Sequence, residues 1–104
     1  MDGIGNIRVL LFRSGSGYFA QGLECNYGAE GKTVDDAKRA FEDGFSSLLE
    51  AHLEENETVA DLFARKVSRG YWTSLVTEAR FIESWTSPRI APFEGIDFFV
   101  VNGR

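Results

Sequence analysis

The chain has very little of the chemistry that catalysis and metal binding use most. It contains one cysteine, Cys25, and one histidine, His52. A single cysteine excludes an intramolecular disulfide, and these two residues are too few for a structural zinc site. His52 falls on or beside the apolar side of a predicted helix, where histidine is usually packed, and no basic residue adjoins Cys25 to favour its thiolate. We predict no catalytic residue, no metal ligand and no cofactor.

Long hydrophobic runs are also missing. The longest, 9–12 and 98–101, have four residues each, whereas a membrane-spanning helix needs about 20. The sequence opens Met1-Asp2-Gly3, without the basic and apolar regions of a signal peptide. Together with the low cysteine content, these absences predict a soluble, cytoplasmic protein with no membrane partner.

What the sequence does contain is the composition of one ordinary globular domain. Its 104 residues are 43% hydrophobic and 26% charged, and domains cluster near ~100–150 residues. Nine Phe, two Trp and three Tyr are many for this size. Most of these rings are expected in the core, although several of them on an exposed contact patch would equally suit an interaction protein.

Negative charge is concentrated in one segment. The net charge is −5, and residues 32–57 alone hold eight acidic and three basic side chains. A net-acidic domain lacks the Lys/Arg surface that binding to nucleic acid needs, which argues against a nucleic-acid partner. The acidic segment either steers a basic protein toward this domain or is the solvated face of a helix.

Three short strands are predicted near the N-terminus. Residues 7–12 form the first, the Gly- and Ser-rich stretch 13–17 forms a turn, and 18–23 form the second strand. An antiparallel hairpin is the simplest topology for this pair. A third short strand is predicted at 27–30. Gly22 indicates a bulge or a close backbone approach in the second strand.

The clearest predicted element is a long amphipathic helix at 34–54. Thr33 is a good N-cap, and Asp35 and Asp36 lie in the first turn, where the helix dipole favours negative charge. Gly44 costs the helix about 1 kcal/mol relative to Ala, a cost that the close approach of a strand would explain. The apolar residues recur at spacings of three and four, which predicts a face packed on the sheet: Val34, Ala37, Phe41, Phe45, Leu48 and Leu49.

The C-terminal half is less clear. A helix is predicted at 59–68 and another at 71–84, although the aromatic and β-branched content of 71–84 also suits a strand. Residues 95–101 are predicted as a final strand. The prediction is thus a single α+β domain, 1–104, with a C-terminal extension from about residue 58. Its three- to four-stranded antiparallel sheet carries one long amphipathic helix.

Short motifs between residues 17 and 49 resemble the HicB family of antitoxins and their solitary relatives. They cover the first half of the chain, and Ala40 and Gly44 fall where small residues recur in the family's helix. The sequence departs from the family pattern in two places: Leu23-Glu24 stands where the family has Pro-Gly, and Glu30 stands where it has Gln. The motifs are Gly17-Tyr18-Phe19-Ala20, Leu23-Glu24-Cys25, Glu30-Gly31-Lys32-Thr33 and Val34-Asp35-Asp36-Ala37.

The resemblance implies a three-stranded antiparallel sheet with one packed helix, like a fragment of the ribonuclease H fold. Family members neutralise a small basic ribonuclease toxin of the HicA type by covering its active site, and they are usually oligomers. Many add a helix-turn-helix or ribbon-helix-helix segment that binds operator DNA, for which the residues after 58 show no pattern. The surface that binds the partner is predicted at an acidic rim beside an aromatic residue: Glu24, Tyr27, Glu30, Asp35 and Asp36.

Two functions of different classes remain open. The first is a HicB-like antitoxin, or interaction protein, that binds and neutralises a small basic ribonuclease toxin. The alternative is a solitary HicB-like domain, a homodimer or higher homo-oligomer with a structural or regulatory role, which the aromatic-rich second half suits. A DNA-binding regulator would have only Arg65, Lys66 and Arg69 for phosphate contacts, and a ribonuclease H-like enzyme would need strand carboxylates that 7–12 lacks.

Overall fold

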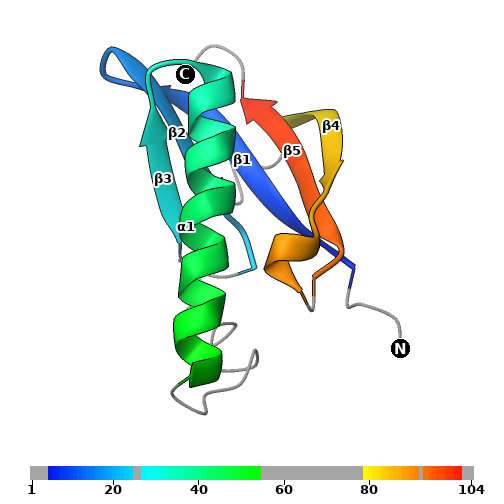
Figure 1. Ribbon diagram of the computed structural model, residues 1–104. Coiled ribbons are helices and arrows are strands. Elements are labelled where there is room, and N and C mark those ends of the chain that lie inside the picture. The colour runs from blue at the N-terminus through cyan, green and yellow to red at the C-terminus, as the bar shows by residue number, and fades with distance from the viewer. Residues whose placement is uncertain (1–4, 25–26, 55–78, 92, 102–104) are drawn as a thin grey trace.

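The computed structural model describes residues 5–24, 27–54, 79–91 and 93–101, which form a five-stranded sheet with one long helix across one face (Figure 1). Within these residues, no helix has the length and apolar character that crossing a bilayer requires. The elements are β1 (Asn6–Ser14), β2 (Gly17–Gly22), β3 (Gly28–Gly31), α1 (Val34–Glu54), β4 (Ala79–Thr86), the 3-10 turn η1 (Pro88–Ile90) and β5 (Gly95–Val101).

The first three strands form an antiparallel meander, as predicted. β1 pairs with β2 from Val9 opposite Gly22 to Ser14 opposite Gly17, and β3 pairs with β2 on its other side. Gly22 is the last residue of β2 and pairs in regular register with Val9. The bulge that the sequence analysis considered at Gly22 is therefore not present. Gly15 in the connecting turn has a φ of 62°, a left-handed conformation that glycine adopts without strain.

The sheet as a whole is mixed and has five strands, in the order β3-β2-β1-β5-β4. β5 runs parallel to β1, with Ile7 opposite Ile96, and β4 is antiparallel to β5. The prediction of a three- to four-stranded antiparallel sheet was therefore wrong in strand count and in the direction of one pairing. The hairpin pattern of the first half does not reveal how a strand from the far end of the chain enters the sheet.

Residues 79–84, predicted as the end of a helix, lie in β4 instead. Their ladder with β5 places Phe81 opposite Phe99, and the two rings are 5.6 Å apart. Pairing with β5 therefore decided a conformation that local spacing left ambiguous, as is common for aromatic and β-branched stretches. The predicted helix at 59–68 and residues 71–78 lie outside the described residues.

The long helix begins and ends where the sequence predicted. The backbone N–H of Asp36 donates a hydrogen bond to Thr33 Oγ1 (3.1 Å), so Thr33 is the N-cap. Phe41 and Phe45 are fully buried and stack at 5.5 Å. Burying a ring of this kind stabilises the fold by roughly 1.5–3 kcal/mol. The rest of the core between α1 and the sheet consists of Ile7, Val9, Leu11, Ala20, Ala37, Leu49, Ile90, Phe93, Ile96 and Phe98.

Candidate interaction surface

The carboxylate of Glu24 is held by β1. Its carboxylate accepts a hydrogen bond from the backbone N–H of Arg8 (2.8 Å) and forms an ion pair with Arg8 Nε (2.6 Å). Next to it, the N–H of Leu23 donates to the carbonyl oxygen of Arg8 (2.9 Å). Only 24% of the Glu24 side chain is exposed. Glu24 therefore fastens the segment after β2 to β1, and Arg8 compensates its charge.

Tyr27 is partly buried and packs against the core. Its ring lies 5.3 Å from that of Phe41 and 6.1 Å from that of Phe45, and its hydroxyl rests against Gly44. A Cβ at position 44 would collide with this hydroxyl, so Gly44 makes room for a side chain and not for a strand. Burial raises the pKa of Tyr27 above its ordinary value, because the phenolate would lose hydration.

The other three predicted residues, Glu30, Asp35 and Asp36, are exposed at the β3 edge and the start of α1. Gly31 lies so close to the backbone of Asp36 that a Cβ would not fit between them, which brings the strand and the helix together. Ala29 packs toward the helix, so Glu30 points to the opposite face of the sheet. The end of β3 and the first turn of α1 thus lie at the same margin of the molecule, and we call Glu30, Asp35 and Asp36 together the acidic edge.

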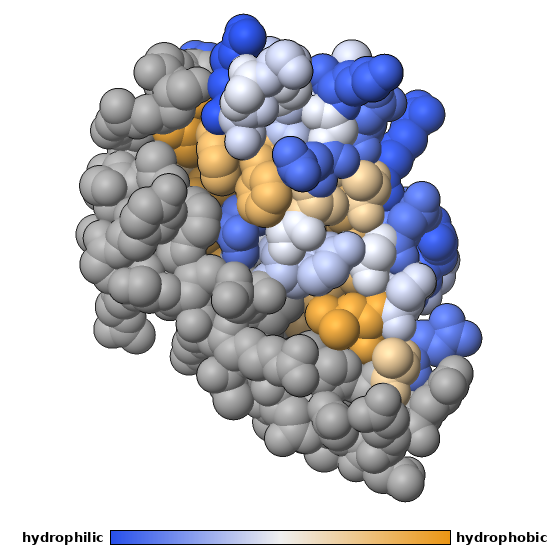
Figure 2. All heavy atoms as spheres, turned by 90° about the vertical axis from the view of Figure 1, so that its left-hand side faces the viewer, coloured by the Kyte–Doolittle hydropathy of each residue, from blue (hydrophilic) through white to orange (hydrophobic). Residues whose placement is uncertain are grey.

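The charges of the acidic edge are largely uncompensated. Among the described residues, no ion pair holds Glu30 or Asp36. Asp35 forms an ion pair with Lys38, with 3.8 Å between Oδ1 and Nζ, while its side chain remains 73% exposed. Figure 2 faces the β3 side of the molecule and shows hydrophilic side chains along its margin with apolar side chains exposed between them. Charged groups in this position attract a partner of opposite charge.

A shallow hollow adjoins the acidic edge, between the β1–β2 turn and the end of β3. Its walls are mostly small residues and backbone, so a side chain of another molecule can approach the main chain there. In the described part of the chain, no three His, Cys, Asp or Glu side chains come together as metal ligands, and these acids do not form such a group. The hollow is lined by Ser14, Gly15, Ser16, Gly17, Glu30, Gly31 and Lys32.

A set of contacts that the sequence analysis missed joins α1 to β4. Lys38 is only 4% exposed, and its ammonium pairs with the carboxylate of Glu83 and lies 5.4 Å from the ring of Phe98. Glu83 also accepts a hydrogen bond from Trp85 Nε1 (3.0 Å). The hydrogen bond from Lys38 is the main reason that the pKa of Glu83 is lowered. The signal in the sequence was a lysine four residues after Val34, within the apolar stripe of the helix.

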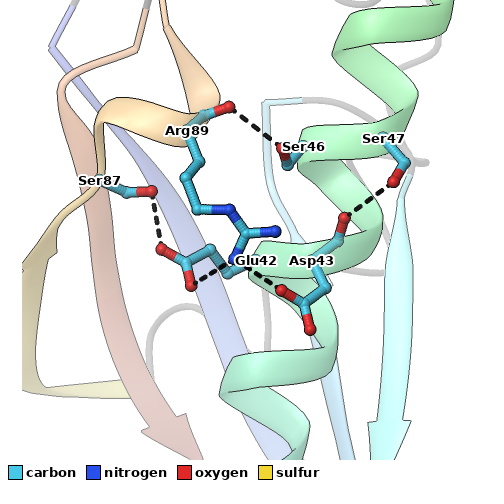
Figure 3. Close-up of polar contacts among 6 residues, drawn as sticks. All are labelled: Glu42, Asp43, Ser46, Ser47, Ser87 and Arg89. Carbon is cyan, nitrogen blue, oxygen red and sulfur yellow. Dashed lines mark hydrogen bonds and ion pairs between the residues drawn. The ribbon is translucent and has the colours of Figure 1, made fainter.

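A second missed group, which we call the clasp, fastens η1 to the middle of α1 (Figure 3). Arg89 Nη1 lies 2.6 Å from Asp43 Oδ1 and 3.4 Å from Glu42 Oε1. Ser87 Oγ donates to Glu42 Oε2 (2.7 Å), and Ser46 Oγ donates to the carbonyl oxygen of Arg89 (3.2 Å). The clasp holds the segment that leads into β5, and the carboxylates of Glu42 and Asp43 are both engaged in it.

β4 is the outer strand of the sheet and carries the large hydrophobic side chains that are most exposed in the described residues. Phe81 is 53% and Ile82 is 40% exposed. The opposite outer strand, β3, has four residues and lies against α1. An exposed outer strand presents unpaired backbone N–H and C=O groups. No other strand of the described residues pairs with the outer side of β4, so β4 is an edge at which another strand can pair.

Comparison with protein-family models, with curated proteins and with solved structures gives no significant match for this chain. The function proposed for its surfaces is therefore argued from their geometry and charge and from the short motifs of the first half.

Proposed function

We propose that the protein is a HicB-like antitoxin, which binds a small basic ribonuclease toxin and neutralises it by covering its active site. The observation that carries this proposal is the acidic edge, where Glu30, Asp35 and Asp36 stand exposed beside a shallow hollow. A surface of this charge attracts a basic protein and speeds its association.

The structural roles of the motif residues support the proposal. Gly17 begins β2 and leaves no space for a Cβ beside the carbonyl of Gly31, while Gly31 itself lies against the first turn of α1. Thr33 caps the helix, and Gly44 accommodates Tyr27. The described residues of these motifs thus lie in or next to β2, β3 and α1, which pack on one another, and this placement supports the proposal.

Within the predicted partner surface, the structure separates residues that offer charge from residues that shape the fold. Glu24 is paired with Arg8, and Tyr27 is packed on α1. We therefore assign the direct attraction of a basic partner to the acidic edge. Glu24 and Tyr27 support it indirectly, because they hold the chain between β2 and α1.

The test is to isolate the protein from its native host with its bound companions and to identify them by mass spectrometry. The proposal expects a small basic protein at a fixed ratio, which cleaves RNA once it is separated and stops cleaving when the two are mixed again. A companion with no ribonuclease activity would contradict the antitoxin function, and so would the recovery of copies of this chain alone.

The second candidate function is that of a solitary HicB-like domain which acts as a homo-oligomer with a structural or regulatory role. The observation that favours it is the exposure of Phe81 and Ile82 on the outer strand β4. Recovery of copies of this chain alone in the same isolation would support this function over the first.

A further inference from the structure

We propose that β4 pairs with β4 of a second copy of this chain, antiparallel and about a two-fold axis through its β-bulge. The two five-stranded sheets would then form one continuous ten-stranded sheet. This inference does not depend on a toxin, because it concerns the edge of the sheet opposite to the acidic edge.

The first observation is the bulge itself. In the ladder with β5, Phe81 lies opposite Phe99 and Glu83 lies opposite Phe98, so Ile82 is an extra residue in β4. A bulge of this kind makes two residues occupy the space of one and shifts the alternation of the side chains that follow. Phe81 and Ile82 together therefore count as one position of the strand.

The second observation is that this shift places opposite charges symmetrically around the bulge. Arg80 lies opposite Val100, and Glu83 lies opposite Phe98. Val100 and Phe98 are two residues apart on β5, so they share one face of the sheet, and Arg80 and Glu83 share it with them. Without the bulge, residues 80 and 83 would point to opposite faces.

These positions decide the register of a self-pairing. In a two-fold antiparallel pair, residues at equal distances from the axis lie opposite one another. An axis through the Phe81–Ile82 position puts Arg80 opposite the second copy's Glu83 on the same face, twice in the dimer. Opposite charges in such cross-strand positions attract, and the exposed Phe81 and Ile82 of both copies meet at the centre.

The charges available at β4 also favour this pairing. Among the described residues, no ion pair or hydrogen bond engages the Arg80 side chain, so its charge is available. Glu83 keeps 44% of its side chain exposed while it binds Lys38, and a carboxylate has further lone pairs to offer. β4 holds one base and one acid, so two copies meet without a local excess of negative charge, although each chain carries −5.

The test is sedimentation velocity of the full chain over a range of micromolar concentrations. We expect a dimer that dissociates on dilution, and Arg80→Glu is expected to raise its dissociation constant by about 10-fold, because two attractive pairs become repulsive. Arg39→Glu, which makes the same charge change at an exposed position of α1, is expected to leave the dissociation constant unchanged. Circular dichroism verifies that both variants are folded.

A disulfide test reports on the register. In a Cys25→Ser background, Ile82→Cys should form a covalent dimer on mild oxidation, because opposed residues of antiparallel strands lie within the Cα range of a disulfide. Glu50→Cys, exposed on α1, should not. A monomer at every concentration would overturn the proposal. A dimer that Arg80→Glu does not weaken and that Ile82→Cys does not cross-link would equally overturn it.

Discussion

At the scale of single residues, the clearest relationship is between Tyr27 and Gly44. The phenol packs on Phe41 and Phe45, and its hydroxyl fills the space that a side chain at position 44 would need. Gly44 has poor helix propensity, but a larger residue at this position of α1 would collide with the Tyr27 hydroxyl. Packing between the two residues outweighs the local preference for Ala.

This relationship predicts the effect of Gly44→Ala. Ala improves helix propensity by about 1 kcal/mol, but its methyl group collides with the Tyr27 hydroxyl, and such overpacking typically costs about 1–3 kcal/mol. We expect Gly44→Ala to lower the free energy of unfolding, measured by urea denaturation. Adding Tyr27→Phe, which removes the hydroxyl, should recover part of the loss. A Gly44→Ala variant more stable than the wild type would contradict this packing.

Glu83 gives a prediction about pH at the same scale. Its pKa is lowered from the ordinary value of 4.5, chiefly by the hydrogen bond from Lys38. A carboxyl group with a lowered pKa in the folded state stabilises the fold above its unfolded pKa, and this stability is lost as the pH falls through the folded pKa. The wild type should therefore exceed Glu83→Gln in stability at pH 7, and the difference should shrink below about pH 4.5. A difference that is constant with pH would contradict the assignment.

At the scale of elements, local signals determined what the sequence could predict. α1 has its predicted bounds because a cap, an acidic first turn and an apolar stripe all agree. β5 also matches its predicted bounds, 95–101, as an apolar run between turn residues. β4 was mistaken for helix, because its spacing fits both structures and only its ladder with β5 decides between them. The parallel pairing of β5 with β1 has no local signal at all.

The helix start offers a test at the element scale. Thr33→Ala removes the side-chain oxygen that accepts the hydrogen bond from the N–H of Asp36. We expect it to lower the free energy of unfolding by about 1 kcal/mol, as for other N-caps. Thr33→Ser keeps the hydroxyl and serves as the matched control, with little expected change. Equal stabilities of the wild type and the Ala variant in urea denaturation would mean that the cap does not stabilise α1.

The candidate site was only partly predictable, for a related reason. The sequence marked Glu30, Asp35 and Asp36 as acids near a helix start, and they are exposed there. It could not show that Glu24 pairs with Arg8, 16 residues earlier. The missed contact between Lys38 and Glu83 joins residues 45 positions apart. Contacts of this range depend on the topology of the sheet, which the local pattern does not contain.

At the scale of the whole molecule, the strand order separates two surfaces. β3, with the acidic edge, and β4, with Phe81 and Ile82, are the two outer strands of the same sheet. Three strands lie between them, so a partner attracted by the acidic edge and a second copy paired at β4 would not compete for the same residues. We therefore propose that self-association and toxin binding are compatible in one assembly.

The acidic edge gives the most direct test of the proposed function. The measurement is the cleavage of a labelled RNA by the ribonuclease co-isolated with this protein, titrated with purified wild type and variants. The wild type should stop cleavage, whereas Glu30→Lys with Asp36→Lys should need about 10-fold more protein or greater, because the attraction of a basic partner is reversed. Glu50→Lys with Glu94→Lys, the same charge change at exposed positions elsewhere, should inhibit as the wild type does. Equal inhibition by both double variants, or no inhibition by the wild type, would contradict the proposal.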